Sequence, residues 1–449
     1  MAARQSSIIT RVAYGVSQLP RVAWYLGHGL ALRRLAEAAR RNNGAKARRR
    51  VHTSAPVPDR SRLYADMARL FLQDLANVES GIYPLPADRD GSLITLINRS
   101  WLFFEDLPEI NRRREGRAYN EIFDKDTRGT RPRYYLQNFH YQSGGWLTDE
   151  SAERYDTQVE VLLNGTANAM RRQALPQLQE LFAGRDQRQL HLLDIGCGTG
   201  RFLDFVKQAW PRLQIVGLDM SDAYVRYARR HLRRRPRTSF VIGKAEAIPL
   251  ADGSQDAVTS IFLFHELPPK VRRSALRECA RVLKPGGRLI LQDSLQRYDR
   301  PDYEGLLRLF PQSYHEPYYA SYIKEDFAAL ASGCGLIPVR SVMAFVYGLR
   351  QSYGTRSHRL EQADTKGRGA PLVNFARVAS VLCVGSLLWL LCTVSALYSV
   401  CCVLWRRLTT TAPHGGRAPH YGGVVVWRRC TKAAAYYGSP YYDGSSLWP

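Results

Sequence analysis

Three glycines at alternate positions, Gly196, Gly198 and Gly200, mark the stretch of this 449-residue chain where chemistry is most readily placed. The residues before them, 190–195, form a short apolar run that is typical of a buried parallel strand. Apolar residues then recur at helical spacing over 202–209, so the glycines occupy a strand-to-helix turn. Glycine allows positive φ and close approach of a ligand, and the helix start presents unpaired N–H groups. The stretch therefore predicts a ligand-binding turn.

Two acidic residues narrow the class of ligand. Asp194 precedes the turn, and Asp219 closes the next apolar run, 213–218, nineteen residues after Gly200. An acid at the end of that second run can accept hydrogen bonds from ribose hydroxyls. Arg201 stands where a dinucleotide fingerprint would have its third glycine, which disfavours a nicotinamide or flavin site. The alternative, a tight turn without a ligand, is weakened by the two acids.

A histidine at the end of the fourth predicted strand is the candidate catalytic base. Phe264-His265-Glu266 lies where open α/β sheets place ligands, at the carboxyl edge. Histidine titrates near neutral pH, so His265 could take a proton from a phenol or quinol. A histidine that only caps a turn or lines the pocket is the alternative, and the sequence leaves it open.

A dense group of aromatic residues just ahead of the glycine turn is the candidate acceptor site. Within 131–160 it includes Tyr141, Trp146 and Tyr155, and a second group over 314–322 includes Tyr318. Aromatic rings bury apolar ligand surface, and their polar tips orient the ligand. These four residues are therefore predicted to contact the substrate. A cover helix packed on the sheet is the alternative.

The elements that would position these residues alternate regularly. Apolar strands are predicted at about 190–195, 213–218, 238–243, 256–264 and 288–293, with helical segments between them and two final strands at 336–340 and 342–348. Such alternation predicts a parallel sheet covered on both faces.

At this level of detail the chain resembles a known family. Residues 192–203, 217–221, 245–250 and 282–289 resemble the successive motifs of the class I S-adenosyl-L-methionine (SAM) methyltransferases, type 11 domain. Tyr155-Asp156 is similar to the ubiquinone and menaquinone biosynthesis methyltransferases. The resemblance implies a Rossmann-like, doubly wound, mostly parallel seven-stranded sheet whose last strand is antiparallel.

The same resemblance implies SAM as the cofactor. The glycine turn with Asp194 would approach the amino-acid end of SAM, Asp219 would hold the ribose, and Ala245 and Glu246 would lie near the adenine. The residue before Ala245 is commonly an acid in this family, whereas this chain has Lys244. An ammonium group offers no acceptor to the adenine amine, so Lys244 is excluded from the predicted site.

Composition restricts the other function classes. The net charge is +24, but residues 1–58 hold ten Arg, one Lys and one acid, so much of the excess lies at the ends of the chain. That distribution disfavours a nucleic-acid groove on the domain. The eight cysteines show no metal-ligand spacing, which indicates a reducing compartment, and no metal site is predicted.

The two ends suggest membrane or organelle targeting. The uncharged stretch 22–32 between arginines is consistent with an interfacial helix, a transit peptide or a helix packed on the domain. Val378 to Trp405 is uncharged over 28 residues, which predicts one transmembrane helix. The expected localisation is single-pass and membrane-associated, in a mitochondrion or plastid.

The predicted domain order and function follow. The segments are a basic targeting or membrane-surface segment (1–58), a helical extension (59–130), the methyltransferase domain (131–350), a linker (351–377), the transmembrane helix (378–405) and a disordered basic tail (406–449). The predicted function is methyl transfer from SAM to a small lipophilic acceptor, such as a quinone precursor or a prenylated or sterol-like compound. An RNA-modifying methyltransferase and a membrane-tethered SAM-binding protein without catalysis are the alternatives.

Overall fold

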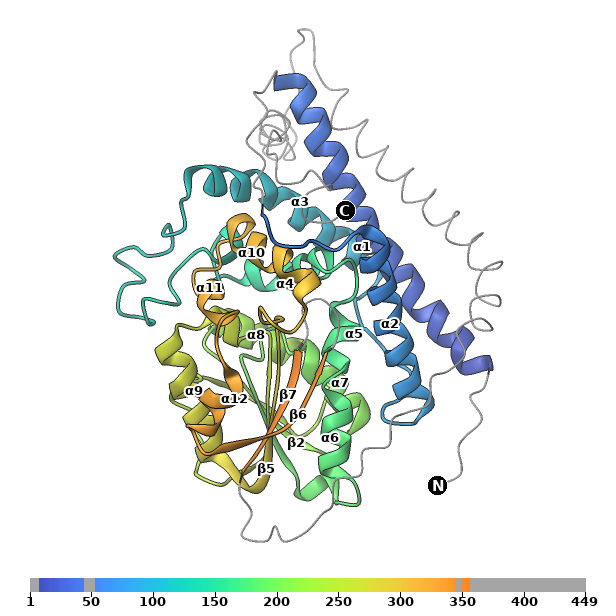
Figure 1. Ribbon diagram of the computed structural model, residues 1–449, viewed down its shortest axis with the longest axis vertical. Coiled ribbons are helices and arrows are strands. Elements are labelled where there is room, and N and C mark those ends of the chain that lie inside the picture. Colours follow the sequence, from blue (N-terminus) through green and yellow to red (C-terminus); the bar gives the residue numbers. More distant parts are fainter. Residues whose placement is uncertain (1–7, 44–52, 344–348, 356–449) are drawn as a thin grey trace, which may run out of the picture.

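The computed structural model describes residues 8–43, 53–343 and 349–355 (Figure 1). Within these residues seven strands form one sheet in the order β3-β2-β1-β4-β5-β7-β6. The strands are β1 (His191–Ile195), β2 (Gln214–Asp219), β3 (Thr238–Ile242), β4 (Gln255–Ile261), β5 (Leu283–Asp293), β6 (Leu336–Met343) and β7 (Leu349–Thr355). β1 pairs in parallel with β2 and β4, whereas β7 is antiparallel to β5 and β6. The mostly parallel sheet with an antiparallel last strand is confirmed.

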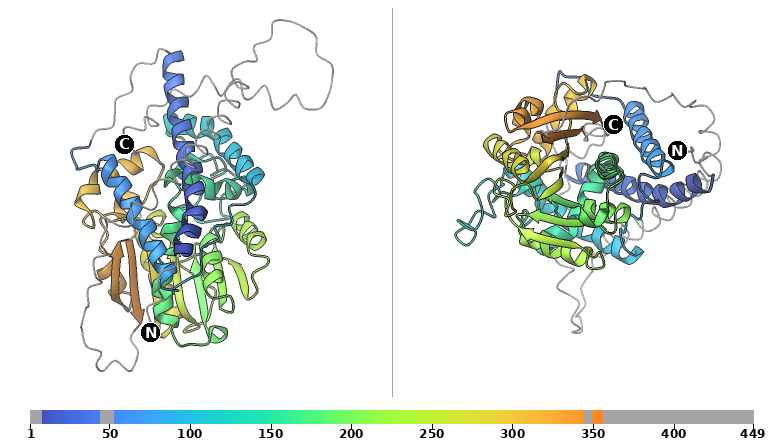
Figure 2. Two further views of the ribbon diagram at one scale, coloured as in Figure 1. Left: turned by 90° about the vertical axis from the view of Figure 1, so that its right-hand side faces the viewer. Right: turned by 90° about the horizontal axis from the view of Figure 1, so that it is seen from below.

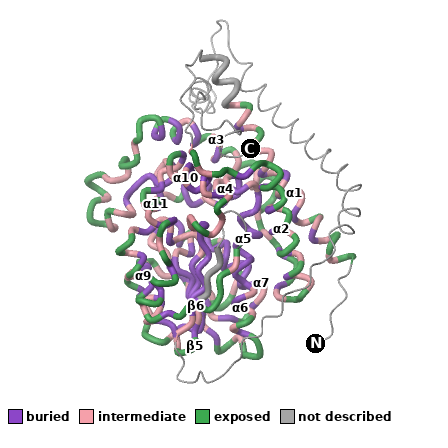
Figure 3. Tube along the Cα trace, viewed as in Figure 1, coloured by how far each residue is buried: buried purple, intermediate pink, exposed green. Residues whose placement is uncertain are grey.

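The central strand β1 packs its alternate side chains into opposite layers. Leu193 and Ile195 belong to one core cluster with residues of α9 (Pro269–Val282), and Leu192 belongs to a second cluster with residues of α7 (Arg201–Ala209). A strand buried on both faces is an apolar run rather than an alternating pattern, which is why the sequence identified it. Figure 3 shows the sheet as buried chain running through the centre of the molecule.

A layer of helices lies over one end of the sheet (Figure 1). It contains α3 (Leu93–Gly116), α4 (Asp149–Leu162), α10 (Glu304–Ser313) and α11 (Tyr319–Tyr322). The other helices are α5 (Ala167–Arg172), α6 (Leu175–Phe182), α8 (Asp222–His231) and α12 (Phe327–Ser332), with short 3-10 turns η1 (Phe139–Tyr141), η2 (Gln187–Gln189), η3 (Phe264–Glu266) and η4 (Pro301–Tyr303).

The N-terminal helices α1 (Ile8–Asn43) and α2 (Arg60–Glu79) lie side by side against the domain (Figure 2). Arg21 of α1 donates to the carbonyl oxygen of Gly165 at 2.8 Å and pairs with Asp90 at 2.6 Å. Tyr25 of α1 is 3% exposed and belongs to a core cluster with Phe103 of α3. Of the three interpretations of the stretch 22–32, the structure therefore supports a helix packed on the domain.

The predicted transmembrane helix is the part of the fold assignment that is wrong. Within the described residues no helix is both long and apolar enough to cross a bilayer. The longest of them, α1, is interrupted by charged residues such as Arg11, Arg21 and Arg33. Residues 378–405, where the span was predicted, lie outside the described residues. The transmembrane helix is withdrawn, and with it the single-pass, membrane-associated localisation.

The last strand also differs in position from its prediction. It was expected at 342–348, but β6 continues to Met343 and β7 begins at Leu349. β7 ends at Thr355, so it extends into the segment predicted to be a linker. The predicted remainder of that linker and the predicted basic tail, 356–377 and 406–449, lie outside the described residues.

Candidate functional site

The glycine turn has the conformation that its sequence predicts. β1 ends at Ile195, and Gly196, Gly198 and Gly200 have φ of 67°, 53° and 75°. These are left-handed values that glycine adopts without steric cost. A Cβ added at Gly198 would lie 4.0 Å from a ring carbon of Tyr155, which lines the cavity described below. The absence of side chains at the turn therefore leaves its backbone open to a ligand.

Asp219 binds the same turn from the end of the neighbouring strand. Its Oδ2 accepts the Gly198 N–H at 2.8 Å, and its Oδ1 accepts the Ser221 N–H at 2.8 Å. Burial raises the pKa of Asp219, and the backbone hydrogen bonds oppose that rise. β2 lies next to β1 in parallel register, with Ile195 opposite Leu218, so the turn and this carboxylate meet at one edge of the sheet.

A cavity opens over this edge, with an empty volume of about 760 Å³ including its mouth. Its floor includes Gly196, Gly198 and Asp219, with Ala245 and Glu246 from the segment after β3. Leu263 and Glu266, which follow β4, close another side. Parallel strands thus deliver four chain segments to one place.

Six aromatic rings form the opposite wall of the cavity. They are those of Tyr134, Tyr135, Phe139, Trp146, Tyr155 and Tyr224. The ring of Trp146 packs edge to face on Tyr155 and Tyr224, with centroids 5.5 and 5.7 Å apart. Ser221 fixes this wall to the sheet, because its Oγ donates to the carbonyl oxygen of Trp146. Trp146 and Tyr155 are therefore in the predicted acceptor region.

Glu246 carries a free acceptor into the cavity. Its Oε1 accepts the Tyr134 hydroxyl at 2.7 Å, whereas its buried Oε2 has no hydrogen-bond partner among the described residues. Lys244, excluded by the sequence analysis, is exposed and does not line the cavity. The acceptor that Lys244 could not provide is therefore present two residues later.

Asp194 and Gly200 do not line the cavity but support the turn. Asp194 accepts the Thr259 hydroxyl at 2.7 Å beneath the turn, and burial raises its pKa to about 7. Gly200 precedes α7, and a Cβ there would lie 3.0 Å from a methyl carbon of Leu232. Both residues support the shape of the turn, and their part in cofactor binding stays a prediction.

Tyr141 and Tyr318 also lie outside the cavity lining. Tyr141 packs against the cluster of Tyr25 and Phe103, on the outer side of the helical layer. The Tyr318 hydroxyl accepts from Gln137 Nε2 at 3.0 Å, one layer behind the wall. Their substrate role has no geometric support here.

His265 lies beside the cavity and is held by Asp293. Its Nδ1 is 2.5 Å from Asp293 Oδ1, and it does not line the cavity. Burial lowers the pKa of His265, but Asp293, Glu316 and Glu266 outweigh it and raise the pKa to about 9. His265 is therefore mostly protonated at neutral pH, where an imidazolium cannot accept a proton. Its role as a base stays a prediction without geometric support.

The neighbouring Glu266 is the cavity residue that sequence reasoning passed over. It lines the cavity, and burial together with Glu316 raises its pKa well above the usual range. His265, the residue before it, was chosen as the candidate base because a free histidine side chain titrates near neutral pH. Glu266 could have been found from its position in Phe264-His265-Glu266. Adjacent side chains of a 3-10 turn point in different directions, so the residue next to His265 was an equal candidate for the cavity.

The comparisons with known proteins agree with this geometry. The profile of a family described as a methyltransferase domain matches residues 192–287. The demethylmenaquinone methyltransferase of Thermotoga maritima is 34% identical over 149 residues, 33% of this chain and 60% of that protein. The ubiquinone/menaquinone biosynthesis C-methyltransferase of Geotalea uraniireducens is 34% identical over 174 residues, 38% of this chain and 67% of that protein.

The overlap with the relatives is partial. The chain spans less than two thirds of the Thermotoga protein, and it matches 35% of the malonyl-[acyl-carrier protein] O-methyltransferase of Methylococcus capsulatus, at 40% identity over 98 residues or 22% of this chain. Among solved structures, a SAM-dependent methyltransferase from Aquifex aeolicus aligns with 46% of this chain and 98% of its own, at a TM-score of 0.34 and 19% identity.

Proposed function

This chain belongs to the class I SAM-dependent methyltransferases, and from that premise we propose that it transfers the methyl group of SAM to a small, largely apolar acceptor. The observation that carries the proposal is the composition of one cavity. Its floor is the glycine turn with Asp219, and its opposite wall is made of aromatic rings. A polar cofactor and an apolar acceptor would therefore meet in the same enclosed space.

The cavity residues fit SAM, which supplies a methyl group on an electrophilic sulfonium. The glycine turn offers backbone without side chains to the amino-acid end. Asp219 lies at the end of β2, where a carboxylate can accept ribose hydroxyls. Glu246 Oε2, buried without a partner, is matched to the adenine amine, which needs an acceptor. Each part of the cofactor thus has a complementary group in this chain.

The protein's contribution to the reaction is to align the acceptor with the methyl group of SAM and to exclude water. Positioning of two reactants can contribute about 7–11 kcal/mol to lowering a barrier. Trp146, Tyr155 and Tyr224 hold one another in edge-to-face contacts, so the wall is rigid enough to fix an acceptor. Its rings also displace water from the reacting atoms, which prevents side reactions.

The acceptor class follows from the wall. The six rings present large apolar surfaces with a few hydroxyl tips, a composition that suits a flat or prenylated ring compound. Two relatives are named for methylation of quinone precursors, and one is named for methylation of a carrier-bound malonyl group. We propose a hydroxylated, lipophilic ring compound of the quinone-precursor class.

The test is transfer of labelled methyl from SAM by the full chain. The acceptor panel contains short-chain demethylmenaquinol, a monocyclic phenol, malonyl-acyl carrier protein and bulk RNA. We expect saturable SAM binding by calorimetry and the highest kcat/KM for the prenylated quinol. SAM binding without transfer to any acceptor would reduce the protein to a binding module, and preferential labelling of RNA would overturn the lipophilic-acceptor assignment.

A further inference from the structure

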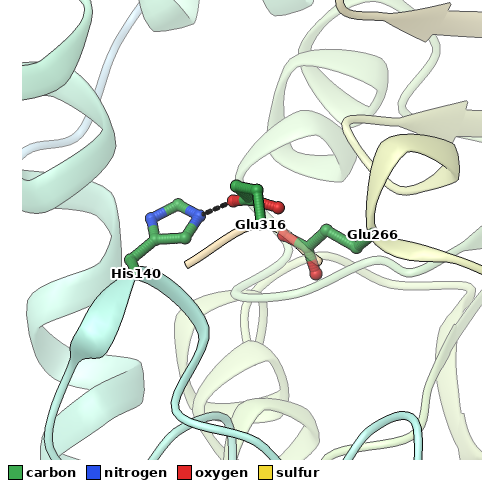
Figure 4. Close-up of side chains that lie close together, drawn as sticks. All are labelled: His140, Glu266 and Glu316. Atoms are coloured by element: carbon green, nitrogen blue, oxygen red, sulfur yellow. Dashed lines mark ion pairs between the residues drawn. The ribbon is translucent and has the colours of Figure 1, made fainter. Parts of the chain in front are cut away.

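Three side chains from distant parts of the chain converge beside the cavity. They are His140 of η1, Glu266 of η3 and Glu316, which lies between α10 and α11 (Figure 4). One ligand-type atom from each lies within 4.8 Å of the other two. Figure 4 shows the imidazole and both carboxylates pointing toward one another from different elements.

The innermost of these groups has an unsatisfied charge. Glu316 is 2% exposed, and neither of its carboxylate oxygens has a hydrogen-bond partner among the described residues. Its Oε1 forms an ion-pair contact with His140 Nε2, but that nitrogen also lacks a hydrogen bond. A buried carboxylate is usually paired, hydrogen-bonded or bound to a metal ion. Among the described residues, the only ion pair of Glu316 is with an imidazole, and no lysine or arginine neutralises it.

Several other buried acids of this arginine-rich chain pair with an arginine. Asp74 pairs with Arg172 at 2.6 Å and Asp156 pairs with Arg201 at 3.0 Å. No Lys or Arg forms an ion pair with Glu266 or Glu316 in the part of the chain that the structure describes. His265 lies 3.9 Å from Glu266, and Asp293, which contacts His265, adds a third carboxylate. His315 also interacts electrostatically with Glu316 and His140, so three carboxylates and three imidazoles lie close together.

We propose that His140, Glu266 and Glu316 bind a divalent cation at the edge of the cofactor cavity. One imidazole and two carboxylates suit Mn²⁺, Fe²⁺ or Zn²⁺ better than Mg²⁺, because imidazole is a softer ligand than oxygen. Three protein ligands leave coordination positions open, as in metal sites that bind a substrate. Glu266 also lines the cavity, so the open positions face the acceptor side.

The cation would hold an oxygen of the acceptor, and this part of the inference rests on the proposed function. A metal ion binds a hydroxyl or enol oxygen most strongly as the anion, and that oxygen then loses its proton to solvent. The cluster thus selects acceptors that carry such an oxygen near the methylated position. His265 need not act as a base if a cation lowers the pKa of this hydroxyl.

No metal site is predictable from the spacing of cysteine and histidine in this sequence. The three ligands lie 126 and 50 residues apart in the chain, and only the fold brings them together. Without the structure, each is one of many isolated His or Glu residues.

Metal binding is tested on the full chain after treatment with a chelator. Mn²⁺, Zn²⁺ and Mg²⁺ are titrated separately by calorimetry, and bound Mn²⁺ is observed by electron paramagnetic resonance. We expect one Mn²⁺ or Zn²⁺ per chain, with affinity at least tenfold lower in Glu316→Gln and His140→Asn. Glu304→Gln is the matched control, because Glu304 pairs with Arg297 and Arg308 away from the cluster.

Thermal unfolding separates metal binding from a structural role of Glu316. If Glu316 serves only the His140 ion pair, Glu316→Gln lowers the melting temperature of metal-free protein. If the cluster is a cation site, the same change leaves the metal-free protein as stable or more stable, and abolishes the rise that MnCl₂ causes in the wild type.

Three results would overturn the cation site: no bound Mn²⁺ or Zn²⁺ in the wild type, equal binding in Glu316→Gln, or a loss of stability in the metal-free variant. SAM titrations of the same samples keep the two proposals apart. Cation binding without SAM binding would leave the site and refute the proposed function, whereas methyl transfer in chelated protein would leave the proposed function and refute the cation's role in holding the acceptor.

Discussion

At the scale of single residues, Asp219 gives the clearest test of the cofactor site. Its two oxygens accept the N–H groups of Gly198 and Ser221 at the cavity floor. We expect Asp219→Ala to lower the affinity for SAM by about 1.5–3 kcal/mol, the usual range for hydrogen bonds to a charged group. Calorimetric titration of the full chain with SAM measures this change.

The matched control for that variant is Asp222→Ala. Asp222 is three residues away, its side chain is 43% exposed and it pairs with Arg226 on the surface. It does not line the cavity, so SAM affinity should not change. Unchanged SAM affinity in Asp219→Ala, or an equal loss in both variants, would show that the cofactor does not bind at this carboxylate.

His265 is the residue at which the sequence and the structure lead to different expectations. Removal of a general base usually costs ~10²–10⁴-fold in turnover. Because His265 lies outside the cavity lining and Asp293 keeps it protonated, we expect His265→Asn to lower kcat by less than about tenfold. The asparagine amide can still donate to Asp293. A steady-state loss of a hundredfold or more would restore the role of base.

Sequence reasoning located the cofactor side of the site better than the acceptor side. Gly196, Gly198 and Asp219 were identified because a turn and the strand end beside it are local patterns. Tyr141 lies outside the cavity lining, because aromatic density does not tell which ring of a short turn faces inward, and its contact with the substrate stays a prediction. In η1, Phe139 points to the cavity whereas Tyr141 packs on the outer cluster.

At the scale of elements, the strands that are short, mostly apolar runs were placed closely. β1, β2 and β3 match their predicted bounds within about one residue, whereas β4 ends at Ile261, three residues before its predicted end. β7 was missed, since its sequence Leu349-Arg-Gln-Ser-Tyr-Gly-Thr355 is mostly polar. The last strand was instead predicted at 342–348, where the residues are mostly apolar. Pairing with β5 and β6 defines this strand, and such partners are distant in sequence.

The docking of α1 should be sensitive to acid through His28. Its Nδ1 donates to the Trp24 carbonyl oxygen at 2.9 Å, and its Nε2 lies 2.8 Å from the Ser100 hydroxyl of α3. Burial lowers the pKa of His28 to about 4, so the unfolded chain binds its proton first as the pH falls. His28 therefore contributes full stability above pH about 6.5, and this contribution falls between about 6.5 and 4.

Urea unfolding at pH 7 and pH 5 measures this effect. The loss of stability between the two values should be smaller in His28→Gln than in the wild type by about 2 kcal/mol, because the amide does not titrate. His191→Gln is the control, since His191 has a side chain that is 40% exposed. Equal pH dependence in His28→Gln and the wild type would contradict the prediction.

At the scale of the whole molecule, the basic N-terminus is partly neutralised by the domain on which it lies. Arg21 of α1 pairs with Asp90 and Glu160, and Arg11 pairs with Glu79 of α2 at 2.8 Å. The sequence showed the excess of arginine in 1–58 but not the distant acids that meet it. Charge counted along the chain thus does not show which of these arginines the folded domain already pairs.

One buried arginine joins these N-terminal helices to the domain, and its replacement should lower the free energy of unfolding. Arg172 of α5 pairs with Asp74 of α2 at 2.6 Å and with Asp88 at 2.8 Å, and it donates to Gln18 of α1 at 3.1 Å. Arg172→Met leaves two buried carboxylates without their cation, which typically costs about 3–5 kcal/mol. We expect that loss in urea unfolding of the full chain, together with faster proteolysis of α1.

The control is Arg188→Met, which breaks an exposed pair with Asp186 and should leave the unfolding midpoint unchanged. A loss below about 1 kcal/mol in Arg172→Met would mean that the acids are satisfied without it, and that α1 and α2 are held by apolar packing alone.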